Sequence, residues 1–198
     1  MTRSIRWGFT ALAIAILCVA AGEAQDFKPE AGYTALFNGK DLTGWHYVVK
    51  KGEKEDLSGK KESSDKRFEV KDDAIVANAK DAGGKGGIKD LYTDKVFEKD
   101  FHLKLEFRAA EKADSGVYIR GPQLQVRDFL RRNEEASLKD NFKNDDWNEL
   151  DITVKGGEAE IKFNGKDWKK MKVPAKGPIG LQAESGKFEF RRVRAKEL

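Results

Sequence analysis

Three side chains with flat hydrogen-bonding groups alternate along one short segment of the chain. Gln123, Gln125 and Arg127 are separated by Leu124 and Val126. Because side chains point to alternate faces of a β-strand, the two amides and the guanidinium share one face, and the apolar residues share the other. Such a face offers several hydrogen bonds at once to a polyhydroxylated ligand. The alternative is a solvated outer face of a sheet with no ligand.

A second short strand, Val117 to Arg120, precedes this segment, and Gly121-Pro122 separates the two. Alternation places Tyr118 and Arg120 together on the polar face. The Tyr118 ring could stack on a sugar. Arg120 and Arg127 could each bind a ligand oxygen, or could pair with acidic side chains on the sheet instead.

Two carboxylates are the candidates for acid–base chemistry. Glu184 comes two residues after Gln182, so both are expected on one strand face, and Asp128 follows the polar row directly. A carboxyl buried beside apolar groups has a raised pKa, which suits a general acid or base. We therefore assign Glu184 and Asp128 as candidate catalytic residues and Gln182 as a further ligand contact. A solvated strand end and a turn-capping Asp are the alternatives.

Neither a transition metal nor an organic cofactor is expected. His46 and His102 are the only two histidines, and neither has a partner at a metal-ligand spacing. The segment from Asp140 to Asp146 is rich in oxygen ligands, which leaves calcium open, but its spacing does not match an EF-hand. The Gly-rich segment from Asp81 to Gly87 lacks the Gly-Lys-Ser/Thr ending of a phosphate loop.

Short alternating segments separated by Gly and Asn turns recur along the chain, and no amphipathic helix interrupts them. This pattern predicts an all-β fold, an antiparallel β-sandwich over residues 33–198. One helical turn is expected between Arg131 and Asn144, and Lys50 to Lys66 is expected as a surface loop. Trp45 is expected to be structural. Trp147 is expected to be a core anchor, with stacking on a sugar as the alternative. The predicted strands are Tyr33–Phe37, Arg67–Val70, Ala74–Ala77, Ile88–Thr93, Phe101–Arg108, Val117–Arg120, Gln123–Arg127, Trp147–Val154, Ala159–Phe163, Gly177–Gln182 and Lys187–Arg191.

The N-terminal residues have the pattern of a secretory signal peptide. A basic start is followed by an apolar run from Gly8 to Ala21 and by a small residue at Ala24, so residues 1–24 are the predicted signal and 25–32 a short linker. The predicted location is periplasmic or extracellular, with no membrane anchor after cleavage. Cys18 is the only cysteine and lies inside the signal, so the mature chain would have no disulfide.

The charges are dense but balanced in sign. The chain has 38 Lys and Arg against 34 Asp and Glu, which gives a net charge of +4. The cations are scattered among acidic residues, without the basic stripe of a nucleic-acid-binding domain. A nucleic-acid partner is therefore not expected, and a carbohydrate partner is.

Five motifs in order resemble the 3-keto-disaccharide hydrolase domain family, once catalogued as a domain of unknown function. They span nearly all of the predicted mature chain. The motifs are LFNGKDLTGW (residues 36–45), DSGVYIR (114–120), DWN (146–148), GPIGLQ (177–182) and Phe190-Arg191.

The resemblance implies a concanavalin-A-like lectin/glucanase jelly roll whose polar concave sheet is the site. It also implies activity on 3-keto-glycosides, as a hydrolase, a 3-keto-glucoside 1,2-lyase or a 3-keto-2-hydroxy-glucal hydratase. A ketone at C3 acidifies the C2 proton. A base removes that proton, the C1 substituent leaves by β-elimination, and water adds back.

Two residues depart from the pattern that many members of this family share. Gln123 stands where they have Glu, and Glu184 stands where they have His. Three hypotheses therefore stay open. The first is an exported enzyme that cleaves 3-keto-glycosides, the second is a non-catalytic carbohydrate-binding module, and the third is a structural or cell-surface interaction domain.

Overall fold

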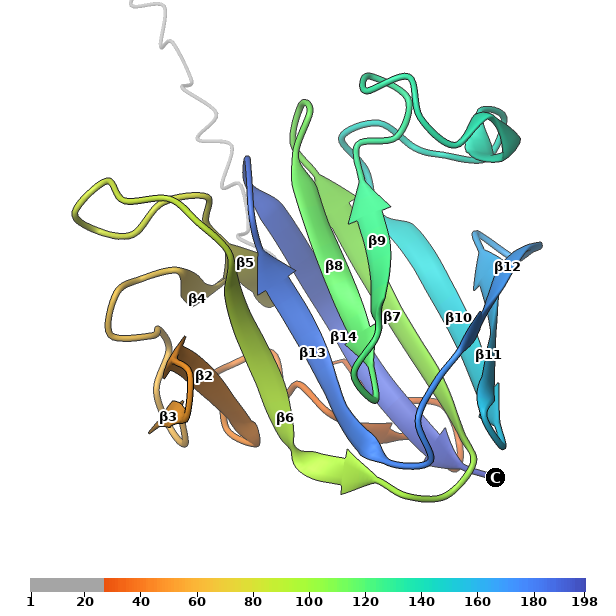
Figure 1. The fold of residues 1–198 in the computed structure, drawn as a ribbon, viewed down its shortest axis with the longest axis horizontal. Helices are drawn as coiled ribbons and strands as arrows, with labels where there is room; N and C mark the ends of the chain where they lie inside the picture. Colours follow the sequence, from red (N-terminus) through yellow and green to blue (C-terminus); the bar gives the residue numbers. More distant parts are fainter. Residues whose placement is uncertain (1–26) are drawn as a thin grey trace, which may run out of the picture.

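The computed structural model describes residues 27–198, and two antiparallel β-sheets packed face to face make up most of this part of the chain (Figure 1). The six-stranded sheet has the order β3-β2-β6-β13-β8-β9. The eight-stranded sheet has the order β12-β11-β10-β7-β14-β5-β4, and the short β1 pairs with β14. The predicted all-β sandwich is confirmed.

The chain crosses repeatedly between the two sheets, often after two or three consecutive strands in one of them. The six-stranded sheet contains β2 (Trp45–Lys50), β3 (Glu53–Asp56), β6 (Lys89–Phe97), β8 (Asp114–Ile119), β9 (Gln123–Arg127) and β13 (Gly177–Ala183). The eight-stranded sheet contains β1 (Thr34–Ala35), β4 (Phe68–Lys71), β5 (Ala74–Ala77), β7 (Phe101–Ala109), β10 (Asn148–Lys155), β11 (Glu158–Phe163), β12 (Lys166–Lys172) and β14 (Phe188–Glu197). The expected helical turn is the 3₁₀ turn η1 (Ala136–Leu138) between β9 and β10.

The alternation seen in the sequence sets which face of each strand enters the core. In β7 every second residue is buried, beginning with Phe101, and the intervening polar residues are half-buried on the outer face. β10 alternates in the same way and pairs with β7. Full burial of a large apolar side chain contributes about 1.5–3 kcal/mol, so these matched inner faces hold the two sheets together.

Aromatic side chains fill the space between the sheets. The Phe107 ring lies 5.2 Å from that of Phe188 and 5.9 Å from that of Phe163, measured between ring centroids. Trp45 is fully buried, and its indole nitrogen donates a 2.7 Å hydrogen bond to the carbonyl oxygen of Leu36. The structural role expected for Trp45 is confirmed, since it ties the two ends of the LFNGKDLTGW motif together.

Three strands lie where the sequence pattern predicts none. β2 follows Gly44, β3 lies inside the segment expected as a loop, and β12 follows the Asn164-Gly165 turn. β3 and β12 are edge strands with the sequences EKED and KDWKKMK, so they lack the alternation that marks a half-buried strand. Charged side chains, Lys above all, are common on edge strands because they prevent pairing with other chains.

The predicted signal peptide, residues 1–24, lies outside the described residues. Within residues 27–198, no helix has the length and apolar character needed to cross a membrane.

Candidate functional site

The outer face of the six-stranded sheet carries most of the side chains singled out from the sequence. Four of its strands, β6, β8, β9 and β13, bury inward-facing residues in the core. These residues are Leu91, Val117, Leu124 and Leu181. Their neighbours in the sequence therefore point outward. This polar face comprises Asp90 and Tyr92 of β6, Gln182 of β13, Glu184 just after β13, Tyr118 of β8, and Gln123, Gln125 and Arg127 of β9.

A chain of hydrogen bonds orients the amides at the centre of the polar face. The Gln123 amide donates to the side-chain oxygen of Gln182 at 2.8 Å, and the Gln182 amide donates to the Tyr118 hydroxyl at 2.8 Å. Gly116 makes this possible, because a Cβ there would lie 2.0 Å from the amide nitrogen of Gln123. The sequence therefore brings Gln123, Gln182 and Tyr118 together, as expected.

Two tyrosines form an aromatic pair beside these amides. Tyr92 and Tyr118 lie on strands that flank Gly180, and their ring centroids are 5.3 Å apart. Burial raises the pKa of Tyr92 to about 12 and also raises the pKa of Tyr118. Both hydroxyls therefore keep their protons at neutral pH, and the Tyr92 hydroxyl can donate a hydrogen bond to a ligand oxygen.

Asp90 is a carboxylate on this face that the sequence analysis missed. It pairs with Gln182 across β6 and β13, and its Oδ1 atom is buried without a hydrogen-bond partner in residues 27–198. Burial raises the pKa of Asp90, and a hydrogen bond from Tyr118 partly opposes that rise. A half-buried carboxylate with a free oxygen is equipped to accept a proton. The signal was present in the alternation of Asp90 and Tyr92 within the predicted strand Ile88–Thr93.

Glu184 lies at one end of the polar face. Burial and the nearby Asp114 carboxylate raise the pKa of Glu184, while the guanidinium groups of Arg127 and Arg132 oppose that rise. The two carboxylates of the face, Asp90 and Glu184, thus share an environment that favours their protonated forms. Such a pair can supply a base and an acid to one ligand.

Arg127 and Gln125 are held by acidic and backbone partners at the same end of the face. Arg127 donates to Asp114 at 2.9 Å and to Glu134 at 2.6 Å. The Gln125 amide donates to Asp114 and, at 2.8 Å, to the carbonyl oxygen of Ser115. These contacts hold the Gln125 and Arg127 side chains in place at this end of the polar face. They also leave Arg127 with less capacity to bind an anionic ligand.

Arg120 and Asp128 do not lie on the polar face. Arg120 has a left-handed backbone with φ of 55°, is buried, and donates to the carbonyl oxygens of Lys99 and Pro174. Asp128 is fully buried, and its Oδ2 atom accepts hydrogen bonds from the Lys112 amide and the Arg131 guanidinium.

Glu184, Asp128, Arg120 and Arg127 therefore do not converge in one pocket, since only Glu184 and Arg127 come together. The positive φ of Arg120 breaks the alternation after Tyr118. Asp128 follows Arg127, so its side chain points to the opposite side of the sheet. Both residues instead tie loops to the sandwich.

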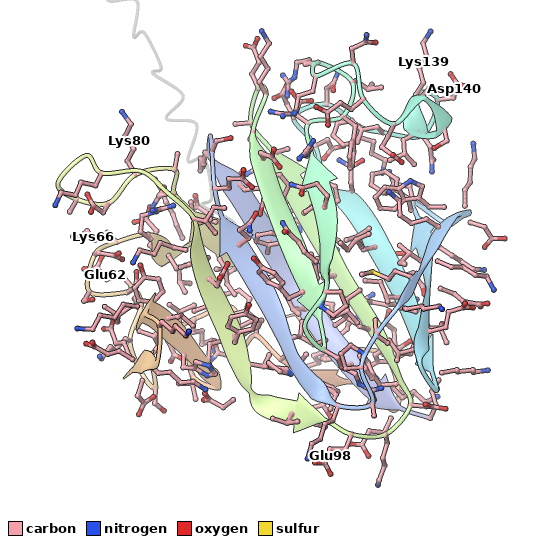
Figure 2. The ribbon with its side chains drawn as sticks, in the orientation of Figure 1. Glu62, Lys66, Lys80, Glu98, Lys139 and Asp140 are labelled. Carbon is pink, nitrogen blue, oxygen red and sulfur yellow. The ribbon has the colours of Figure 1, made fainter. Side chains whose placement is uncertain are left out.

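No metal centre emerges in the part of the chain that the structure describes. Within residues 27–198, no three His, Cys, Asp or Glu side chains are grouped to hold a metal ion. In the oxygen-rich loop considered for calcium, Asp140 projects outward beside Lys139 at the tip (Figure 2). Asp145 of the same loop pairs with Arg131 at 2.9 Å.

A comparison with models of protein families shows the family to which this chain belongs. The model of the 3-keto-alpha-glucoside-1,2-lyase-like domain matches residues 32–196. The chain belongs to this family. The resemblance inferred from the five motifs is confirmed, and membership places this 3-keto-alpha-glucoside-1,2-lyase-like domain among carbohydrate-active proteins. A comparison with curated protein sequences found no significant match.

Solved structures support the fold of the 3-keto-alpha-glucoside-1,2-lyase-like domain. A predicted glycosyl hydrolase from Parabacteroides distasonis superposes with a TM-score of 0.62 at 20% identity, covering 84% of this chain and 94% of that one. The carbohydrate-binding module CBM66 from Bacillus subtilis gives 0.52 at 10% identity, covering 78% and 96%. An alginate lyase from Corynebacterium sp. gives 0.51 at 10% identity, covering 79% and 95%. At these identities the likeness shows the fold alone.

Proposed function

We propose that the polar face binds a 3-keto-glycoside and cleaves it by elimination and rehydration. The observation that carries this proposal is the Asp90 carboxylate, whose Oδ1 atom is buried without a hydrogen-bond partner within residues 27–198. It lies beside a pair of tyrosines and a chain of oriented amides. Aromatic rings, amides and a proton-accepting carboxylate together suit the binding and deprotonation of a sugar.

The first step is the removal of the C2 proton by Asp90. The C–H electrons form an enolate with the C3 ketone, and a hydrogen bond from the neutral Tyr92 hydroxyl stabilises its oxygen. The raised pKa of Asp90, caused by burial, makes it a stronger base than an exposed carboxylate, and Tyr92, with a pKa of about 12, stays a donor.

The second step breaks the bond between C1 and the leaving oxygen. The enolate electrons form a C1–C2 double bond, and Glu184 gives its proton to the departing oxygen. The raised pKa of Glu184, caused by burial and by Asp114, favours the protonated form that this step needs. Glu184 follows Gln182 by two residues, and Gln182 pairs with Asp90, which supports the proposal that both carboxylates reach one sugar ring.

The third step returns water to the product. Its oxygen bonds to C1, and a proton returns to C2, so the sum of the three steps is hydrolysis of the glycoside. Without this step the domain would release the unsaturated 3-keto sugar, as a lyase does. We further propose that the reaction takes place outside the cytoplasm, because residues 1–24 have the pattern of a signal peptide.

A second candidate function is a binding module that performs no chemistry. The observation that favours it is the Gln123 amide, which is committed to a hydrogen bond with Gln182 at a position where the family resemblance implies Glu. On this alternative the polar face holds the sugar, and Asp90 accepts a hydrogen bond from a sugar hydroxyl.

The test is incubation with a p-nitrophenyl 3-keto-glucoside, with and without added divalent cations, followed by release of p-nitrophenol. Asp90→Asn is expected to lower the rate by at least about 100-fold. Asp94→Asn, the same change at an exposed position of the same strand, is the matched control and should keep the rate. Binding by calorimetry with no release from the unmodified chain would instead establish the binding module.

A further inference from the structure

Two hollows open on the outer face of the eight-stranded sheet, opposite the polar face. The larger, about 670 Å³, lies between Phe27, the turn at Asn38 and the turn at Asp72 and Asp73. The smaller, about 340 Å³, is lined by Trp147 and its neighbours. Arg191 of β14 lines both, so its side chain is a wall that the two hollows share. We call the two hollows together the Arg191 groove.

The sizes of the two hollows suit a small ligand. Sites for small molecules typically have volumes of about 300–1,000 Å³. Three motifs that identify the family contribute to the groove walls, namely residues 37–39, residues 146–147 and Arg191. None of these residues takes part in the proposed chemistry on the other sheet.

Trp147 supplies an aromatic wall that is held in place. Its ring centroid lies 3.9 Å from the guanidinium of Arg191 and 4.7 Å from that of Arg108. Arg191 is in turn fixed by a 2.7 Å hydrogen bond to Glu106, and Arg108 by one of the same length to Glu189. Trp147 therefore lies on the outer face of the sandwich. The sequence-based prediction that it is a core anchor is wrong. An aromatic ring fixed before binding loses little freedom when a ligand packs on the part of it that the two guanidinium groups leave uncovered.

The charges around the groove nearly cancel. In the larger hollow Lys28, Arg191 and Arg192 face Asp72 and Asp73. In the smaller one Lys143 and Arg191 face Glu106, Asp146 and Glu149. A polyanion or a polycation would meet like charges along the whole length, whereas hydroxyl groups can both donate to the carboxylates and accept from the cations.

We propose that the Arg191 groove is a second carbohydrate-binding site, which takes a neutral oligosaccharide and performs no chemistry. The proposal goes beyond the function proposed for the polar face and does not depend on it. A domain with both sites would hold a neutral glycan on one sheet while the opposite sheet acts on, or binds, a 3-keto sugar.

The test follows the indole N–H signal of Trp147 by NMR, assigned with Trp147→Phe. Cellotetraose and maltotetraose are titrated to about 10 mM, which is ten times a dissociation constant of about 1 mM. A saturable shift of the Trp147 signal with either sugar is expected, and it should be unchanged in Asp90→Asn. Tetragalacturonate, the charged comparison, should produce no shift.

A double substitution of exposed side chains separates binding from folding. Lys143→Ala with Asp146→Asn changes two exposed groups of the smaller hollow without touching the core, and it should weaken the sugar-induced shift at least fivefold while the melting temperature stays the same. Cleavage or binding of the 3-keto-glucoside should stay within twofold in this variant, so failure of one site is distinguishable from failure of the other. No shift with either neutral sugar, or a shift with tetragalacturonate alone, overturns the proposal.

Discussion

Tyr92 and Tyr118 lie side by side across Gly180, with ring centroids 5.3 Å apart and ring planes inclined by 40°. A Cβ atom at position 180 would lie 2.4 Å from the Tyr92 ring and 2.9 Å from the Tyr118 ring. The absence of a side chain at this one position therefore allows the aromatic pair that neighbours Asp90 and Gln182.

Gly180→Ala is expected to separate the two rings. Neither ring can yield without a change of rotamer or backbone, so the free energy of unfolding should fall by about 1–3 kcal/mol. Binding at the polar face should weaken as well. Chemical denaturation and calorimetry measure the two effects. Gly86→Ala is the matched control, because the added Cβ would meet only an ordinary contact at 3.5 Å. Equal behaviour of the two variants would contradict the role given to Gly180.

Asp90→Asn should alter how stability depends on pH. Burial raises the pKa of Asp90, so the native state binds this proton more tightly than the unfolded chain does. The resulting stabilisation is present below the unfolded pKa and is lost as the pH rises through the folded pKa. The Asn side chain does not titrate, so the stability of Asp90→Asn does not fall from this cause over that pH range. The melting temperature of Asp90→Asn relative to the unmodified chain should therefore be higher at pH 7 than at pH 3.

Thermal unfolding followed by circular dichroism at the two pH values gives this comparison. Asp94→Asn controls for the general effect of removing a negative charge from β6. A difference in melting temperature that is smaller at pH 7 than at pH 3 would show that Asp90 is not a carboxylate destabilised by burial.

The sequence predicted the central strands and most of the polar face, because both depend on alternation. Gln123, Gln125, Tyr118 and Gln182 lie where their spacing puts them. Edge strands such as β12 were missed because their charged side chains hide the alternation.

Asp90 and Arg120 show where sequence spacing stops being informative. Asp90 matters because Gln182 faces it from a strand more than ninety positions away in the chain, and that pairing is set by the sheet order β6-β13-β8. Arg120 left the polar face because of its left-handed backbone, which the neighbouring Gly121-Pro122 did not reveal.

Tyr118→Phe should shift the pH dependence of cleavage. The Tyr118 hydroxyl stabilises the charged form of Asp90 and so opposes the rise in the pKa of Asp90 that burial causes. Without the hydroxyl that pKa rises further, and more of the base is protonated at a given pH. The acidic limb of the profile of kcat/KM against pH should therefore move to higher pH. An acidic limb that stays in place or moves to lower pH would show that Asp90 is not the base that removes the C2 proton.

Arg67→Met should destabilise the sandwich and misplace the end of β13. Arg67 is only 1% exposed, and its guanidinium donates to the carbonyl oxygens of Asn78, Gly87 and Ala183. Loss of these bonds leaves buried carbonyls unpaired, so the free energy of unfolding should fall by about 3 kcal/mol or more. Denaturant titration measures the loss, with the exposed Lys66→Met as control. A loss no larger than that of the control would contradict this role.

The central claim is that the polar face removes the C2 proton of a 3-keto-glycoside. Its most direct test is incubation of a p-nitrophenyl 3-keto-glucoside with the domain in D₂O, with mass spectrometry of the released sugar. The account predicts release of p-nitrophenol with one solvent deuteron at C2, both lost in Asp90→Asn and both retained in Trp147→Phe. Absence of release from the folded, unmodified chain, or full release and deuteration by Asp90→Asn, would contradict it.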